Sequence, residues 1–311
     1  MMDVWAFIRS ELLQNHRVVL LYVVESEGSS PGRRDFLMGV SSSGAFYGTI
    51  GGGIMERKLV EEARRVLTDP KAAPYLKRQF HDKAHGLENS GMICSGRQTM
   101  AFVPLSPVAR PLIPEFLQKT DAFQLSEAGF QRVERIKNAQ FQTDESGKWW
   151  YQAHFDQRPV VHIIGAGHVG NALSELMRFL GFYVQLYDDR PDLPMFNANP
   201  FAHEKKLVSY DALSEALNTA PEDFVVLVTF SYATDKRILP QIIHRKLAYL
   251  GMMGSASKCE ALRIALTEEG LPPDVWKHVH APIGIPIHSK TVQEIAVSIA
   301  AEIISVRNQI P

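Results

Sequence analysis

The stretch VVHIIGAGHVGNALSELMRFLGFYVQLYDD, residues 160–189, decides the fold of the second half of the chain. An apolar run ends in a turn with the pattern G-x-G-x-x-G, formed by Gly165, Gly167 and Gly170, and a helix-like run follows. A strand, this turn and a helix in that order indicate a dinucleotide-binding turn. The first glycine permits the turn, the second lets phosphates approach the backbone, and the third allows close packing of helix and strand.

Two further residues of this stretch are candidates for a nucleotide site. Asp188 ends the second strand, where a carboxylate commonly holds a ribose hydroxyl, and it favours NAD over NADP because it repels a 2′-phosphate. His168 lies inside the turn and is either a solvent-facing imidazole or a donor that faces a ligand. The sequence therefore predicts a Rossmann fold and makes NAD(P) a candidate cofactor.

The pattern around this stretch defines the domains. Strand-like and helix-like segments alternate from residue 158 onward, which predicts a doubly wound parallel sheet covered by helices. The preceding segments predict a mixed α/β domain, and DQRP, residues 156–159, reads as the link. We therefore expect an α/β protein with an N-terminal domain over residues 1–157 and a Rossmann-like domain over residues 158–311.

A second candidate anion site lies in YLGMMGSASKCEAL, residues 249–262. Gly254 and Ser255 precede a predicted helix, and Lys258 follows one turn later. The hydroxyl, the amides and the ammonium group are donors for a phosphate, but Ser255 is also a natural helix N-cap. Both interpretations remain open from the sequence.

A third glycine-rich turn lies in the N-terminal domain, in TIGGGIMER, residues 49–57. Gly51, Gly52 and Gly53 stand between a strand and a helix, where bare backbone amides favour an anion. A tight corner is the alternative, although two glycines suffice for one. Glu56 is expected to favour the first turn of the helix through its dipole.

Two other loops of this domain carry polar candidates. GSSPGRRD, residues 28–35, offers the hydroxyls of Ser29 and Ser30 and the guanidinium groups of Arg33 and Arg34 to a phosphate, or is a solvated surface loop. Cys94 lies in a glycine-flanked polar loop near Arg97, which makes it a candidate functional thiol and a candidate molybdenum contact. No catalytic residue is predicted beyond Cys94.

Composition excludes several classes of function. The chain has 311 residues and a formal net charge of −1, which provides no electrostatic footprint for nucleic acid or for an anionic membrane. Its two cysteines, Cys94 and Cys259, form no disulfide framework, so a cytoplasmic location is expected. We predict no metal site, because His81 and His85 lack an evident third ligand.

Taken together, these motifs resemble the XdhC/CoxI family, accessory factors of xanthine dehydrogenase and related molybdenum hydroxylases. The resemblance rests on stretches from both halves of the chain. They are EGSSPGRRDFLMGVSSSGAFYGTIGGGIMERKLVEEA, MICSGR, HIIGAGHVGNAL, YDDRPD, YLGMMGSASK and APIGIPIHSKTVQEIAVSIAAEII.

The resemblance implies a cytoplasmic factor that binds molybdenum cofactor (molybdopterin), supports its sulfuration and inserts it into an apo molybdenum hydroxylase. It implies a homodimer, a sulfur donor as a second partner, and a maturation factor rather than an enzyme. It also implies that the glycine run and Cys94 belong to the part that holds the pterin. The alternatives are an NAD(P)-dependent oxidoreductase, a nucleotide-sensing protein that uses the Rossmann domain, and a purely structural adaptor.

Three departures from the family pattern bear on these expectations. Family members often carry a T-H-x-H-like segment after the third Rossmann strand, where this chain has TFSYATD, residues 229–235. The family often has basic residues after the Gly-Ser turn, where this chain has Ala256 and keeps Lys258. The cysteine loop reads CSG instead of CGG.

Overall fold

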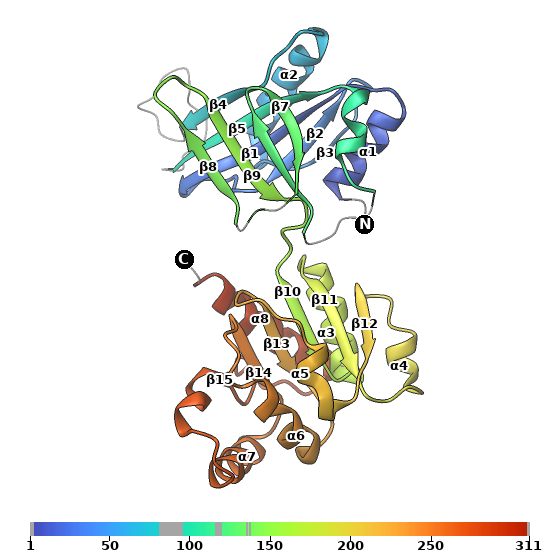
Figure 1. Ribbon diagram of the computed structural model, residues 1–311, viewed down its shortest axis with the longest axis vertical. Coiled ribbons are helices and arrows are strands. Elements are labelled where there is room, and N and C mark those ends of the chain that lie inside the picture. Colours follow the sequence, from blue (N-terminus) through green and yellow to red (C-terminus); the bar gives the residue numbers. More distant parts are fainter. Residues whose placement is uncertain (1–2, 81–95, 116–119, 135, 137, 310–311) are drawn as a thin grey trace. The chain divides into compact units, whose positions relative to one another are not determined.

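The computed structural model describes residues 3–80, 96–115, 120–134, 136 and 138–309. The chain forms two compact units, Met1–Gln157 and Arg158–Pro311 (Figure 1). Each unit has hydrophobic clusters of its own, so the interior of neither depends on side chains of the other.

The described residues of the first unit form two antiparallel sheets and two α-helices. One sheet has the strand order β3-β2-β1-β5-β4, and the other has the order β7-β6-β9-β8. Its helices are α1 (Val4–Leu13), α2 (Gly53–Thr68) and the short 3-10 helix η2 (Pro107–Leu112). Its strands are β1 (Val18–Gly28), β2 (Leu37–Ser41), β3 (Phe46–Gly48), β4 (Tyr75–Phe80), β5 (Gly96–Leu105), β6 (Ala122–Ser126), β7 (Gly129–Val133), β8 (Gln140–Thr143) and β9 (Trp149–His154).

Strand β1 is buried on both faces, which explains its continuous apolar sequence. Leu20 and Tyr22 belong to the cluster shared with the second sheet and α1, whereas Leu21 and Val23 belong to the cluster under α2. Successive side chains of a strand point to opposite faces, so one apolar run serves both clusters. A register shift between Val23 and Glu25 then bends the strand toward its polar end.

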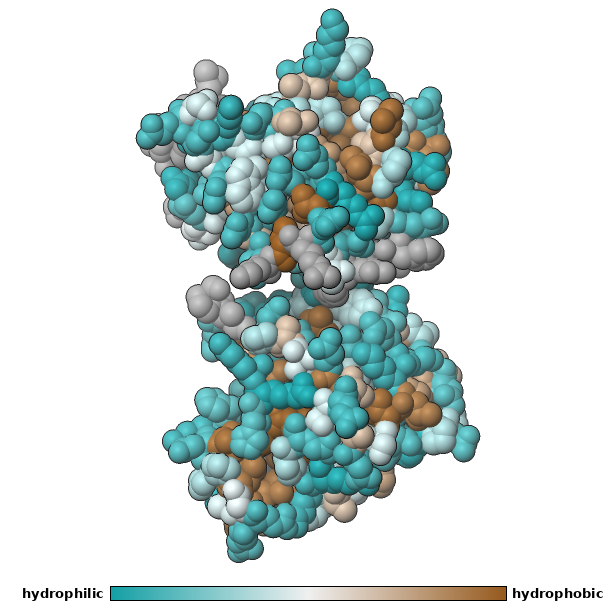
Figure 2. Space-filling view, in the orientation of Figure 1, coloured by the Kyte–Doolittle hydropathy of each residue, from teal (hydrophilic) through white to brown (hydrophobic). Residues whose placement is uncertain are grey.

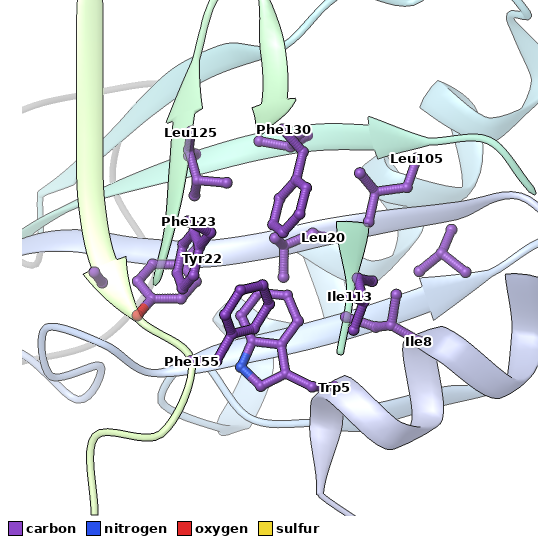
Figure 3. Close-up of a cluster of buried hydrophobic side chains, with 14 of the residues drawn as sticks. Trp5, Ile8, Leu20, Tyr22, Leu105, Ile113, Phe123, Leu125, Phe130 and Phe155 are labelled. Carbon is purple, nitrogen blue, oxygen red and sulfur yellow. The ribbon is translucent and has the colours of Figure 1, made fainter. Parts of the chain in front are cut away.

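Aromatic side chains fill the cluster between the two sheets (Figure 3). The rings of Trp5 and Phe155 meet edge to face with centroids 4.8 Å apart, and Phe123 lies 5.1 Å from Trp5. Figure 3 also shows Ile8 of α1 on the same side of the sheet as Leu20 of β1. The helix therefore closes one end of this core.

The second unit has one six-stranded parallel sheet with the order β12-β11-β10-β13-β14-β15. Read in chain order this is 3-2-1-4-5-6, the order of dinucleotide-binding Rossmann domains. The strands are β10 (Val160–Ile164), β11 (Tyr183–Asp188), β12 (Glu204–Leu207), β13 (Phe224–Leu227), β14 (Tyr249–Met252) and β15 (Val279–His280). The helices are α3 (His168–Phe179), α4 (Pro194–Asn197), η3 (Tyr210–Ala212), α5 (Leu213–Ala216), α6 (Tyr232–Ile242), α7 (Ala256–Glu268), η4 (Pro273–His278) and α8 (Val292–Arg307).

Helices cover both faces of this sheet (Figure 1). On one face, α3 and α8 pack on alternate strand residues such as Ile163 and Val226. On the other face, α5, α6 and α7 pack on the neighbouring residues Ile164 and Leu227. The predicted doubly wound parallel sheet is confirmed.

The surface is largely polar. Hydrophilic residues cover most of the face seen in Figure 2, and hydrophobic ones appear there in small groups. Across the described residues, no helix combines the length and apolar character that crossing a membrane requires.

Candidate functional site

The three glycines of the G-x-G-x-x-G turn occupy the positions that a phosphate-binding turn needs. Gly165 has φ +107°, and a Cβ there would lie 2.7 Å from the carbonyl oxygen of Val228. A Cβ on Gly170 would lie 1.9 Å from the carbonyl oxygen of Gly165. At Gly167 a Cβ would meet no heavy atom of the described chain within 4 Å. The first and third glycines are thus required by packing, whereas the second borders open space.

The turn lies at the switch point of the sheet. Strand β10 runs between β11 and β13, so the connections that leave β10 and β13 go to opposite faces of the sheet. Ligands of open α/β sheets bind in the crevice at this place, outside the carboxyl ends of the strands. The edge beside Gly165 is therefore the candidate nucleotide site.

Asp188 does not face this crevice. Its side chain is fully buried, and Oδ2 accepts hydrogen bonds from the Ala166 N–H (2.7 Å) and from Nη2 of Arg190 (2.8 Å). Its Oδ1 accepts from Nε of Arg190 at 2.8 Å. Burial alone would raise the pKa of this carboxyl, but the hydrogen bonds from Arg190 and Ala166 outweigh it and hold the pKa below its usual value. The role expected for Asp188, holding a ribose hydroxyl, is thus replaced by fastening Arg190 to the glycine turn.

The Gly254–Ser255 turn is a capped helix start. The Ser255 hydroxyl accepts the N–H of Lys258 at 3.2 Å, which is the capping interpretation. Nζ of Lys258 lies 2.5 Å from Oδ2 of Asp235 and also donates to the carbonyl of Met253 at 3.2 Å. Lys258, expected to hold a phosphate, is therefore paired within the protein.

Asp235 is a buried acid that sequence reasoning missed. It is only 1% exposed, and Thr229 donates a hydrogen bond of 2.5 Å to its Oδ1. Burial raises the pKa of Asp235, and the bonds from Lys258 and Thr229 offset this only in part. Thr229 and Asp235 are the first and last residues of TFSYATD, the segment that departs from the family pattern. Lys258 lies 23 residues after Asp235, so no local motif revealed that these three side chains meet.

His168 is exposed at the first turn of α3. It lines a groove of about 520 Å³ between α3 and α8, together with Asn171 and Gln293. This corresponds to the solvent-facing interpretation of the imidazole.

The family stretch before α8 is fastened by Glu302. Its Oε2 accepts the Tyr249 hydroxyl (2.5 Å) and the N–H of Gly284 (2.8 Å), and its Oε1 lies 3.1 Å from Nδ1 of His280. The hydroxyl of Ser298 donates to the carbonyl of Ile285 at 2.6 Å. These contacts fasten the chain at residues 280–285 to α8.

The Gly51–Gly53 turn of the first unit already contains a carboxylate. Oε2 of Glu56 accepts the N–H of Ile50 (2.9 Å), the N–H of Gly52 (3.0 Å) and the hydroxyl of Thr49 (2.7 Å). Of the backbone groups expected to receive an anion, the N–H of Gly52 is thus engaged by Glu56, and the N–H of Gly51 donates to the Thr49 hydroxyl at 3.2 Å. Glu56 acts here by direct hydrogen bonds and not only through the helix dipole.

All three glycines of this turn have backbone conformations that favour glycine. Their φ angles are +126°, +75° and +70°, in the region that side chains disfavour. A Cβ on Gly51 would lie 2.6 Å from the N atom of Gly32, but on Gly52 or Gly53 it would meet no described atom within 4 Å. The corner therefore uses every glycine, contrary to the expectation that two suffice.

Gln98 connects the loop at residues 28–35 to the Gly51–Gly53 turn. This residue was not identified from the sequence. It is buried on β5, and its Oε1 accepts the hydroxyl of Ser30 (2.7 Å) and the N–H of Gly32 (3.1 Å). Nε2 faces the carbonyl of Ile50 at 3.5 Å. Ser30, a predicted ligand donor, is thereby buried as a structural partner. Ser29 and Arg33 are exposed, and Arg33 makes no side-chain hydrogen bond or ion pair with the described residues.

The end of the same loop is tied to the second sheet. Asp35 accepts hydrogen bonds from the hydroxyls of Tyr22 (3.0 Å) and Tyr151, and Arg34 donates to the carbonyl of Ala139 at 2.7 Å. Burial raises the pKa of Tyr22 well above its usual value, and the Asp35 carboxylate raises it further. The hydroxyl therefore remains a donor that holds the loop in place.

The structure describes only one of the two cysteines and neither of the histidines considered as metal ligands. Cys94, His81 and His85 lie outside the described residues. Cys259 is buried, and burial raises the pKa of its thiol, which is consistent with a packing role. The described part of the chain holds no group of three or more His, Cys, Asp or Glu side chains arranged to bind a metal ion.

Comparison with known proteins identifies the family. Residues 161–303 match the XdhC Rossmann domain, and residues 12–78 match the XdhC and CoxI family. The chain is 28% identical over 303 residues to YqeB of Escherichia coli K12, covering 96% of this chain and 45% of that protein. It is 29% identical over 168 residues to a probable xanthine dehydrogenase component of Bacillus subtilis 168, covering 50% of this chain and 49% of that protein.

A solved structure has the same fold. The crystal structure of a xanthine dehydrogenase from Bacillus halodurans superposes with a TM-score of 0.73 at 21% identity, covering 100% of this chain and 97% of that chain. The chain belongs to the XdhC and CoxI family. It spans about half the length of the curated relatives that it matches.

Proposed function

We propose that this chain is an accessory factor for a xanthine dehydrogenase-type molybdenum hydroxylase. Its cargo is molybdenum cofactor, which it holds during sulfuration by a sulfur donor and then passes to the apo-enzyme. The acting form is a cytoplasmic homodimer. The observation that carries the proposal is membership in the XdhC and CoxI family, with matches in both units of the chain.

The loops of the first unit support the location of the cargo. The loop at residues 28–35 packs against the glycine triplet at Gly32 and against β5 at Gly96, where a Cβ would lie 2.6 Å from the N atom of Ser30. The exposed guanidinium of Arg33 adjoins Gly32, and open space borders Gly52 and Gly53. A phosphate bound here would be contacted by a charged donor and by backbone N–H groups at the start of α2. Cys94 precedes β5 by two residues and is the proposed thiol that approaches the molybdenum.

The test is retention of released molybdenum cofactor by the purified chain during gel filtration, followed by pterin fluorescence after oxidation. We expect the wild type to retain cofactor and Arg33→Ala and Cys94→Ala to retain less. Arg110→Ala, which removes an exposed arginine from η2, is the matched control and should retain as much as the wild type. If neither the wild type nor Cys94→Ala retains cofactor, the proposal is wrong.

A second candidate function uses the second unit as a nucleotide site, in an NAD(P)-dependent oxidoreductase or a nucleotide-sensing protein. The strand order and the positions of the three glycines favour it. Gly167→Val is a sharp probe, because the residue has φ −68° and open space where its Cβ would be, so the change blocks a phosphate without straining the fold. Saturable binding of NADH by the wild type and its loss in Gly167→Val would support this function, whereas the absence of saturable binding would exclude it.

A further inference from the structure

A cavity of about 520 Å³ lies beyond the carboxyl ends of β11 and β13 in the second unit. Two segments line it: residues 189–194, which follow β11, and Phe230, which follows β13. Pro191, Leu193 and Pro194 make its walls mainly apolar.

Both walls are attached directly to the G-x-G-x-x-G turn. Arg190 is held by Asp188, which also accepts a hydrogen bond from the N–H of Ala166 inside the turn at 2.7 Å. The backbone of Val228 and Thr229, immediately before Phe230, packs on Gly165, where a Cβ would lie 3.0 Å from the N atom of Thr229. A ligand with phosphates at the turn therefore has its next chemical group beside this cavity.

The cavity has a stacking surface. The side chain of Phe230 is 72% exposed, and the guanidinium carbon of Arg190 lies 5.1 Å from the centre of its ring. Aromatic faces and guanidinium planes are the surfaces on which proteins stack heterocyclic bases. An exposed phenylalanine beside an apolar cavity gains favourable burial when a flat ligand covers it.

The polar rim favours a sugar with free hydroxyls. Asp189 lines the cavity with a partly exposed carboxylate, and Asp192 is an exposed carboxylate on the same segment. The arginines nearby are already paired: Arg190 with Asp188, and Arg237 with Asp189 at 3.5 Å and Asp211 at 3.4 Å. Carboxylates accept hydrogen bonds from ribose hydroxyls and repel a further phosphate.

We propose that this cavity is the base subsite for an adenine nucleotide with an unphosphorylated 2′-hydroxyl. The adenine lies on Phe230 and Arg190, the ribose hydroxyls donate to Asp189, and the diphosphate reaches the glycine turn at Gly167. Asp189 thus takes the role that the sequence assigned to its buried neighbour Asp188. The inference rests on the second candidate function, because it requires that the unit bind nucleotide.

The test measures ADP and nicotinamide mononucleotide binding to the full chain by titration calorimetry. Phe230→Ser should weaken ADP at least about tenfold, the loss that stacking of one base typically represents. It should leave nicotinamide mononucleotide, which lacks adenine, unchanged. Phe179→Ser is the matched control, because Phe179 is 79% exposed on α3 and does not line the cavity, and it should bind ADP as the wild type does.

The outcomes separate the subsite from the nucleotide site itself. If Gly167→Val abolishes ADP binding and Phe230→Ser leaves it unchanged, the base subsite is refuted and the nucleotide site stands. If the wild type binds no ADP, both fail. The sugar contact is checked with NADH and NADPH: NADPH should bind more weakly, and Asp189→Asn should narrow the difference. Equal affinity of the wild type for both would overturn the role of Asp189.

Discussion

At the scale of single residues, Asp188 is the best-defined electrostatic feature of the second unit. It is an ionised carboxylate without solvent exposure, held by a bidentate contact with the Arg190 side chain and by the backbone N–H groups of Ala166 and Arg190. Such a group stabilises the folded state only while it is charged, because its hydrogen bonds favour the ionised form. Its loss would release both Arg190 and the glycine turn.

Replacing Asp188 by Asn should therefore produce a pH-dependent loss of stability. The pKa of the Asp188 carboxyl is lowered by folding, so its contribution is present above the unfolded value of about 3.9 and is lost as the pH falls through the folded value. We expect the variant to be less stable by about 2 kcal/mol near pH 7, the size typical of lost hydrogen bonds to a charged group, and the difference to shrink below about pH 4. Urea unfolding at pH 7, 5 and 3.5, with the exposed Asp192→Asn as control, measures it. A difference that is constant across this range would contradict the assignment.

At the scale of elements, the glycine-rich turns combine two kinds of glycine. Some, such as Gly170 and Gly51, leave no room for a side chain, because a backbone atom lies 1.9 Å and 2.6 Å from where the Cβ would be. Others, such as Gly167 and Gly52, border open space among the described residues. The first kind is required by close packing, and the second kind leaves space beside it for a ligand.

The two kinds should differ measurably within the first unit. Gly51→Ala and Gly52→Ala both place a side chain at positive φ, a cost of about 1–2 kcal/mol. Only Gly51→Ala also forces the loop at Pro31 and Gly32 to move, so we expect it to be the more destabilising variant. Thermal unfolding of the two variants tests the order. Equal destabilisation would show that packing against Gly32 is not essential.

The turns also indicate how far sequence reasoning reaches. The spacing of Gly165, Gly167 and Gly170 correctly predicted a strand, a turn and a helix in a parallel sheet, because close packing in this turn requires glycine at particular positions. The engagement of Asp188 was not predictable, because it depends on how Arg190 folds back. Gln98 was missed for a related reason: a polar residue in a buried strand reveals its partners only when loops distant in the sequence are brought together.

At the scale of the whole molecule, the chain joins two units of different architecture. The first unit is built on antiparallel sheets and the second unit on a parallel sheet. Each hydrophobic cluster draws its residues from one unit. Each unit has the size of a typical independent domain. The family matches likewise divide between them, with residues 12–78 in the first and 161–303 in the second.

We therefore expect residues 158–311 to fold when produced alone. Their far-UV circular dichroism should show the α/β spectrum of a Rossmann domain, and urea should unfold them in one cooperative transition that coincides with a transition of the full chain. The reason is that the two clusters flanking the parallel sheet draw all their residues from this range. A fragment without a cooperative transition would contradict this independence.

At the glycine triplet of the first unit, the carboxylate of Glu56 occupies backbone N–H groups that a bound anion would also use. A phosphate that used the N–H groups of Ile50 and Gly52 would have to displace a competitor tethered to the same helix. Because it is intramolecular, that competitor acts at a high effective concentration that dilution cannot reduce. Its return shortens the residence time of any anion bound there. For a protein proposed to hand its cargo to another, a built-in competitor favours release over storage.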